Sequence, residues 1–486
     1  FTADTACVRG RIEGYSRSQG YSTMLYNRCE PTTGERVPLV VDIREDGTFE
    51  FRFWAWYPVE GALLIEGKDF RKWLNFYAVP GQTTEMVMRA DGSVSCASVP
   101  SGPFGRKRSL EHGVSELCAY PYDEFSAVSD SLGFKDFTEN AMRRMRERLR
   151  AVDYVAWRFG YTPWERHLAK CQTRLVHGMA VFDYEMNQHF SIDWKMAQEE
   201  INKKMAPYRA PANYRFLREM PCNDVSVCVL RDLDIFLNRY EFSSVMRSPA
   251  VLTGSMEPDS VAKEDAAMMA VDTAILRADE PSLLGRLVVL RALSSDLGRN
   301  YSEAPSMYDS IYQNRLAYMN REVLRVQAER LLEQACRRNT LTYALPDTEG
   351  GKLLRRLTEK YRGKYVLIGF WGMFCGPCRS GIERSKPMRE ALRNHSDVDF
   401  LFISTEGEGP EENYRKYVDE HLSGEDVVQV SRDDFNRLME LFNFLGIPHY
   451  ETLDRMGNVV RSGLRYASEE QFRLHLENLK QQLERR

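Results

Sequence analysis

Apolar and polar positions alternate in short runs over the first hundred residues, as they do in half-buried β-strands. An Asp-Gly pair at 46–47 stands between two of these runs and predicts a hairpin turn. No helical pattern interrupts the region, so residues 1–100 predict a small β-sandwich or barrel, and we take the β-sandwich as the prediction. The expected strands cover 8–12, 37–43, 48–53, 62–66 and 84–88.

One of these strands continues into an aromatic stretch at 49–57. Alternation puts Phe49, Phe51 and Phe53 on one face, which predicts the core of the sandwich; an exposed binding platform is the alternative. The polar stretch that follows, 98–113, contains several Gly and Pro residues and predicts a linker or a long crossing loop.

The period of the pattern becomes helical between 114 and 345, so the region 101–345 is predicted to be all α. The longest apolar stripe predicts one helix over 306–338. Pro258, Pro281 and Pro305 stand between segments, where helices begin and end. The other expected helices cover 137–159, 163–187, 192–205, 225–240, 263–278 and 282–297.

From 346 to 486 strand and helix patterns alternate, which predicts an α/β region with a mixed sheet and helices on both faces. The chain of 486 residues is therefore expected to be multidomain, with boundaries near 100 and 345. The expected strands are 365–371, 398–404, 449–453 and 459–462, the last two forming a hairpin, and the expected helices are 375–392, 411–420, 433–444 and 469–483.

Composition narrows the class of protein. Apolar residues make up 43% and charged residues 28%, which indicates a globular rather than a disordered chain. The net charge of −4 argues against a nucleic-acid partner, and the arginine-rich stretch 143–150 predicts a solvated helix face. The sequence contains no run of 18 apolar residues, so no membrane-spanning helix is predicted. The chain begins at Phe1 without a charged and apolar leader, so any export signal is expected to have been removed.

The clearest chemistry lies at Cys375 and Cys378, a Cys-x-x-Cys pair that directly follows the predicted strand 365–371. At a helix N-terminus both sulfurs can approach bonding distance, and the helix dipole and free N–H groups stabilise a thiolate. We therefore predict thiol–disulfide exchange, with Cys375 as the attacking thiol and Cys378 as the resolving thiol.

Half of a zinc site is the alternative for this pair. The sequence has no second Cys-x-x-Cys, and no His lies within a few residues of the motif, so zinc is disfavoured. No metal and no cofactor other than the redox-active disulfide is expected.

Several short motifs surround the pair: Gly363-Lys364 before the strand, Phe370-Trp371 at the end of the strand and before the motif, Cys375-Gly376-Pro377-Cys378, Gly446-Ile447-Pro448, and the turn from Asp454 to Asn458. With these motifs the C-terminal region resembles the thioredoxin superfamily, in particular the TlpA/ResA-type extracytoplasmic thioredoxin-like proteins.

This resemblance implies a thioredoxin-like fold and an oxidoreductase that acts on protein disulfides. The Gly-Pro spacer and Ile447 resemble those of reducing thioredoxins, so a reductant supplied by an upstream electron donor is expected. The resemblance also implies that Pro448 is cis and that the backbone of Ile447 pairs with a substrate strand. The motif and substrate-binding residues that it implies are Trp371, Phe374, Gly376, Pro377, Ile447 and Pro448.

Two positions depart from the family pattern. The family has a buried Asp six residues before the first Cys and a Glu three residues after the second, and this chain has Gly369 and Gly381 there. Such a carboxylate would exchange a proton with the resolving thiol. Proton transfer is then expected through water, through Glu383, or through a residue of another domain.

The layout of residues 1–100 resembles the small accessory β-domain that precedes many envelope TlpA-type proteins of Gram-negative bacteria. The matching segments are Asp-Gly-Thr-Phe-Glu-Phe at 46–51 and Val-Pro-Gly-Gln-Thr at 79–83. This implies an extracytoplasmic protein, either periplasmic or associated with the envelope through a lipid outside this sequence.

Other candidate residues keep two interpretations. Cys222 and Cys228 either form a small structural disulfide or are buried free thiols. His167 and Cys171, four residues apart on a predicted helix with His177 nearby, have a spacing that permits metal binding. No third ligand is evident in the sequence, so ordinary helix packing is favoured there.

Two functions from different classes remain open at this point. The first is a thiol–disulfide oxidoreductase. The second is a non-catalytic or slow redox sensor that binds partners through its helical region, and the glycines at 369 and 381 favour it.

Overall fold

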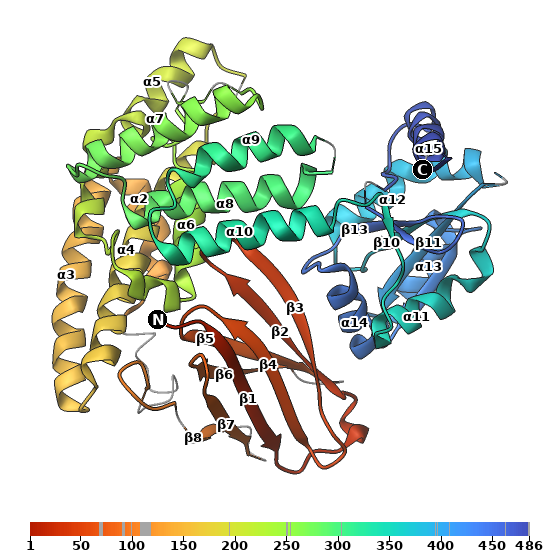
Figure 1. Cartoon of the computed structure of the whole chain (residues 1–486), viewed down its shortest axis with the longest axis horizontal. Coiled ribbons are helices and arrows are strands. Elements are labelled where there is room, and N and C mark those ends of the chain that lie inside the picture. The colour runs from red at the N-terminus through yellow and green to blue at the C-terminus, as the bar shows by residue number, and fades with distance from the viewer. Residues whose placement is uncertain are drawn as a thin grey trace.

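The computed structural model describes the chain in three regions, an N-terminal pair of sheets, a helical middle region and a C-terminal mixed sheet (Figure 1). Half of the stretch predicted as a linker, 98–113, lies outside the described residues, namely 99 and 107–113. No helix among the described residues is both long and apolar enough to cross a membrane. The residues described are 1–486 without 68–70, 90–92, 99, 107–117, 194, 249–250, 253, 303, 394, 396, 408, 462 and 485–486, and without the side chains of 96–98 and 299–300.

In the N-terminal region the described residues form eight strands in two four-stranded sheets, with orders β4-β1-β7-β8 and β3-β2-β5-β6. The apolar sides of both sheets contribute to one core, in which Phe49 and Phe53 are buried, as the alternation predicts. The strands are β1 (Asp4–Ile12), β2 (Thr23–Glu30), β3 (Glu35–Asp42), β4 (Thr48–Ala55), β5 (Val59–Glu66), β6 (Arg71–Ala78), β7 (Thr83–Met88) and β8 (Val94–Ser98).

The predicted hairpin at the Asp-Gly pair is wrong, although the turn itself is present. Gly47 has a φ of 79°, a left-handed conformation that glycine adopts without steric cost. The strands on either side, β3 and β4, belong to different sheets. The turn therefore carries the chain from one sheet to the other instead of pairing its two neighbours.

The central region is built from helices, most of them close to their predicted positions. The exceptions are two predicted helices that are each divided. Residues 306–338 form α9 and α10, and 225–240 form η4 and α6. The elements are η2 (Tyr122–Glu124), α2 (Phe125–Ser131), α3 (Phe134–Arg158), α4 (Pro163–Phe190), α5 (Gln198–Arg209), η3 (Pro211–Glu219), η4 (Val225–Val229), α6 (Asp232–Glu241), α7 (Pro258–Leu276), α8 (Leu283–Asn300), α9 (Pro305–Leu316) and α10 (Glu322–Arg337).

The division between α9 and α10 has a packing reason. Met319 continues the apolar stripe but lies in the turn between the helices, where it is fully buried. Both helices contact α8. A single apolar stripe in the sequence therefore packs two short helices against α8. Within this stripe, the step of five residues from Ile311 to Leu316 is longer than the three or four residues of regular helical spacing.

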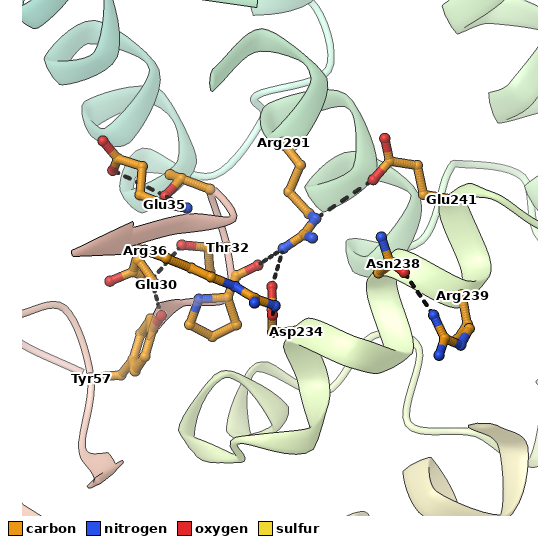
Figure 2. A network of polar contacts seen from close by, with 12 residues as sticks. Glu30, Thr32, Glu35, Arg36, Tyr57, Asp234, Asn238, Arg239, Glu241 and Arg291 are labelled. Atoms are coloured by element: carbon orange, nitrogen blue, oxygen red, sulfur yellow. Dashed lines mark hydrogen bonds and ion pairs between the residues drawn. The ribbon is translucent and has the colours of Figure 1, made fainter. Parts of the chain in front are cut away.

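A buried polar network joins the β-strands to the helices (Figure 2). Asp234 on α6 is paired with Arg36 on β3 and with Arg291 on α8, whose Nη1 lies 2.8 Å from Asp234 Oδ1. Burial alone would raise the pKa of Asp234, but hydrogen bonds from the two arginines lower it overall. Arg291 also donates a hydrogen bond to the backbone oxygen of Pro31 at 2.9 Å. Through its two arginine partners, Asp234 therefore holds β3, α6 and α8 together.

The C-terminal region has a six-stranded sheet of order β12-β11-β10-β13-β14-β9. Strand β10 is buried on both faces, because Val366 and Ile368 belong to one core and Tyr365 and Leu367 to another. The elements are β9 (Thr342–Tyr343), α11 (Glu349–Thr358), η5 (Glu359–Tyr361), β10 (Tyr365–Phe370), α12 (Gly376–Leu392), β11 (Val398–Thr405), α13 (Glu411–His421), β12 (Asp426–Val430), α14 (Arg432–Phe442), β13 (His449–Leu453), β14 (Val459–Val460) and α15 (Glu469–Glu484).

Helix α14 attaches this region to the N-terminal sheets. Asp433 at its first turn accepts hydrogen bonds from Ser22 and Thr23, at 2.7 and 2.6 Å. About two helical turns further on, Glu440 accepts a hydrogen bond from the backbone N–H of Val40 at 2.8 Å. Polar contacts at both ends of one helix therefore fix the C-terminal sheet against β2 and β3.

Candidate active site

The sheet register explains why the two predicted motifs meet. The last residue of β10, Phe370, is paired with His449 at the start of the antiparallel strand β13. The segment after β10 and the segment before β13 therefore emerge at the same edge of the sheet. The first carries Cys375 and Cys378, and the second carries Pro448.

Cys375 and Cys378 form a disulfide, with their Cα atoms 5.2 Å apart. Cys375 is the N-cap of α12, and its sulfur accepts the backbone N–H of Cys378 at 3.1 Å. Pro377 lies in the first turn of the helix, where a missing N–H leaves no hydrogen bond unmade. When the disulfide is reduced, this N–H and the helix dipole can stabilise a thiolate at Cys375.

The two sulfurs have different access to solvent. Cys375 is half-buried, whereas Cys378 is only 1% exposed and belongs to the core beneath the helix. Phe374, next to the outer sulfur, is 82% exposed. A substrate sulfur can therefore reach Cys375 and is shielded from Cys378.

The peptide bond between Ile447 and Pro448 is cis, as the resemblance implies. The backbone oxygen of Ile447 lies 3.6 Å from the sulfur of Cys375. This places the main chain of Ile447 directly beside the accessible sulfur.

Trp371, one of the motif and substrate-binding residues that the resemblance implies, is buried beside the motif. Its side chain is 2% exposed and stacks on Tyr414, with ring centroids 5.5 Å apart. It also lies 5.6 Å from the ring of Tyr417. Trp371 therefore supports the motif from the core and is shielded from a substrate.

Aromatic side chains lie against the two positions where the resemblance would place carboxylates. A Cβ atom at Gly369 would lie 3.2 Å from the ring of Phe402 and 3.4 Å from the hydroxyl oxygen of Tyr466, and one at Gly381 would lie 3.1 Å from the hydroxyl oxygen of Tyr450. The two tyrosine rings meet edge to face, with centroids 4.8 Å apart. Burial raises the pKa of both hydroxyls, so they stay protonated at neutral pH.

Glu383, the predicted proton relay, makes its contact on α13. It accepts a hydrogen bond from the hydroxyl of Tyr417 at 3.3 Å. Five residues separate it from Cys378, which turns it about 140° around the helix axis from that thiol. Its position on α12 therefore places Glu383 on a different face of the helix from Cys378, where Tyr417 binds it.

A groove of about 970 Å³ runs beside Pro377 and Pro448. Three arginines line it, Arg384, Arg461 and Arg465. The lining carboxylate of Glu451 lies 2.8 Å from His449 Nε2. Sequence reasoning missed these arginines because they come from α12 and from the segment after β14, which only the fold brings together.

The structure distinguishes between the interpretations left open for the other cysteines and histidines. Cys222 and Cys228 are free, buried thiols, and burial raises the pKa of each. His177 is turned away from His167 and Cys171, with its Nδ1 2.8 Å from the backbone oxygen of Thr173. Burial lowers the pKa of His177 to about 4.

Comparison with known proteins gives partial matches. No model of a protein family matches the chain. The thiol-disulfide oxidoreductase ResA of Geobacillus thermodenitrificans is 29% identical over 141 residues, which are 28% of this chain and 74% of that protein. This similarity supports a redox function of the thiol–disulfide class at a coarse level.

Solved structures also match over about a quarter of the chain. The thioredoxin domain of a thiol-disulfide oxidoreductase from Bacteroides vulgatus is 25% identical, with 25% of this chain and 83% of that chain covered and a TM-score of 0.22. StoA from Bacillus subtilis is 18% identical, with 24% and 84% covered and a TM-score of 0.20.

Proposed function

We propose that this protein is a thiol–disulfide oxidoreductase that reduces disulfides in other proteins. The observation that carries the proposal is the unequal pair at the start of α12, with Cys375 accessible and Cys378 1% exposed. An exchange enzyme needs one sulfur that a substrate disulfide can reach and a second sulfur that only the first sulfur can reach. This pair has both properties.

The proposed cycle starts from the dithiol. The thiolate of Cys375 attacks one sulfur of a substrate disulfide, the other substrate sulfur leaves as a thiolate, and a mixed disulfide forms. Cys378 then loses its proton and attacks the sulfur of Cys375, which releases the second substrate thiol. Two electrons pass to the substrate, and an upstream dithiol restores the enzyme by the reverse exchange.

The substrate strand is proposed to lie along Ile447. A main-chain oxygen beside the reactive sulfur can accept a hydrogen bond from an extended peptide, as in β-strand addition. The groove beyond Pro448 presents three arginines, so acidic side chains near the substrate cysteine would meet opposite charge. The resemblance to extracytoplasmic proteins supports a periplasmic or envelope-associated location.

The direction of electron flow is tested by equilibrating the protein with mixtures of reduced and oxidised glutathione. Alkylation and mass measurement of the peptide that carries Cys375 and Cys378 give the reduced fraction. A reductant is expected to have a potential nearer that of thioredoxin, about −270 mV, than that of the strong oxidant DsbA, about −120 mV.

The control for this titration is the doubly substituted variant Cys375→Ser, Cys378→Ser, in which the peptide should show no redox change. A wild-type potential near that of the strong oxidant would reverse the proposed direction. A pair that stays oxidised throughout the titration would have a potential below the range that glutathione covers, which is also what a strong reductant would show.

A further inference from the structure

Three potential metal ligands from two separate segments converge on the surface of the helical region. His167 and Cys171 lie on α4, and Asp224 lies in the segment before η4. Cys171 Sγ is 3.6 Å from His167 Nε2 and 3.7 Å from Asp224 Oδ2, and His167 Nε2 is 2.8 Å from Asp224 Oδ2. The third ligand candidate, absent from the sequence pattern, is thus supplied 53 positions after Cys171.

The local structure fixes each side chain for this meeting. Positions 167 and 171 are four residues apart on one helix, so their side chains share a face. Asp224 is the N-cap of η4, and its Oδ1 accepts the backbone N–H of Ser226 at 2.9 Å. That bond leaves Oδ2 as the oxygen that faces the helix, as a partner outside the ligand set commonly orients a metal ligand.

The geometry differs from that of a Cys-His-Asp catalytic relay. A relay uses the two nitrogens of the imidazole separately, one toward the nucleophile and one toward the carboxylate. Here the sulfur and the carboxylate both approach the same nitrogen, Nε2 of His167. One ring nitrogen cannot serve both partners of a relay, whereas three donor atoms around one point are the arrangement of a chelate.

We propose that His167 Nε2, Cys171 Sγ and Asp224 Oδ2 bind a zinc ion, with water as the fourth ligand. Tetrahedral zinc with bonds of about 2.0–2.3 Å separates its ligand atoms by about 3.3–3.6 Å. The distances from Cys171 Sγ to the other two ligand atoms, 3.6 and 3.7 Å, are already close to this range. The distance between His167 Nε2 and Asp224 Oδ2, now 2.8 Å, must increase by about half an ångström. The His167 and Asp224 side chains are 45% and 29% exposed, so they can move apart and admit the ion.

Charge and chemistry also fit zinc. Nitrogen, sulfur and carboxylate oxygen are the donor atoms that zinc takes in proteins, and a thiolate and a carboxylate together balance its two positive charges. Binding transfers the thiol proton of Cys171 to water and replaces the His–Asp contact with two metal bonds. Because one coordination position stays with water, the site is expected to exchange its ion. It would tie α4 to the segment that leads into η4.

Cobalt(II) is the probe that tests this site directly. The full chain is treated with a chelator, kept in its oxidised form so that Cys375 and Cys378 cannot bind metal, and titrated with Co²⁺. A sulfur-to-cobalt charge-transfer band and the visible bands of tetrahedral cobalt are expected, and Zn²⁺ should displace both. The variant Cys171→Ser should lose the charge-transfer band, whereas Cys7→Ser, which alters a buried free thiol on β1, should keep it.

A second variant protects the test against misfolding. Asp224→Asn keeps a good N-cap residue and removes the charged ligand, so the affinity for Co²⁺ should fall at least about tenfold. Absence of the charge-transfer band in the wild-type protein would overturn the proposal. So would a band of unchanged strength in Cys171→Ser, or an unchanged affinity in Asp224→Asn. None of these results depends on the redox function.

Discussion

Replacing Cys375 by serine is expected to reduce the rate of insulin disulfide reduction to that of dithiothreitol alone. Cys375 is the sulfur that a substrate can reach, and the remaining thiol, Cys378, is 1% exposed on the buried face of α12. A serine hydroxyl is not ionised at neutral pH and cannot form a mixed disulfide. The measurement is the time at which the insulin B chain begins to precipitate, followed as turbidity.

The matched control for this experiment is Cys336→Ser. Cys336 is an exposed free cysteine at the end of α10, so its removal tests whether any accessible thiol would suffice. The wild-type rate is expected for this control. If Cys375→Ser kept the wild-type rate as well, the oxidoreductase proposal would be wrong and the sensor alternative would take its place.

Replacing Asp234 by alanine is expected to lower the free energy of unfolding by roughly 3–5 kcal/mol, the usual cost of breaking a buried ion pair. Its side chain is 5% exposed and pairs with Arg36 and with Arg291, the latter 11% exposed (Figure 2). Alanine would leave the buried guanidinium of Arg291 without this partner. Urea unfolding followed by circular dichroism measures the loss.

An exposed ion pair on the same helical region gives the comparison. Glu219 is paired with Arg146, and their side chains are 38% and 55% exposed. Exposed pairs contribute about 1 kcal/mol or less, so Glu219→Ala should change the free energy of unfolding only slightly. Equal effects of Asp234→Ala and Glu219→Ala would contradict the view that Asp234 anchors the sheets to the helices.

Local patterns in the sequence were sufficient to predict a strand or helix wherever the residues of that one element carried the pattern. The buried strand β10 and the helix after it were predicted because a continuous apolar run ends directly at Cys375. Three strands of the N-terminal sheets, β2, β6 and β8, were missed. Strand β2 is an example, since Asn27, Arg28 and Glu30 interrupt its apolar run. Arg28 pairs with Glu30 inside the strand, and Glu30 also accepts a hydrogen bond from Thr32 in the turn that follows.

The parts of the site that sequence reasoning missed are those assembled from distant segments. Phe402 and Tyr466 lie against Gly369, and Tyr450 lies against Gly381, yet no spacing rule links these residues. The absence of both carboxylates was evident from the sequence, whereas the groups that occupy their places required the fold. Asp224 is a similar case, because nothing near His167 and Cys171 in the sequence indicates a third ligand.

The central claim is that Cys375 forms the covalent link to the substrate and Cys378 releases it. The most direct measurement uses Cys378→Ser, reduced and then mixed with an excess of insulin, followed by non-reducing electrophoresis and mass spectrometry of the digest. A stable adduct is expected, in which an insulin cysteine is joined to Cys375 and is released by dithiothreitol. The absence of an adduct at Cys375, or equal labelling of the exposed Cys336, would contradict it.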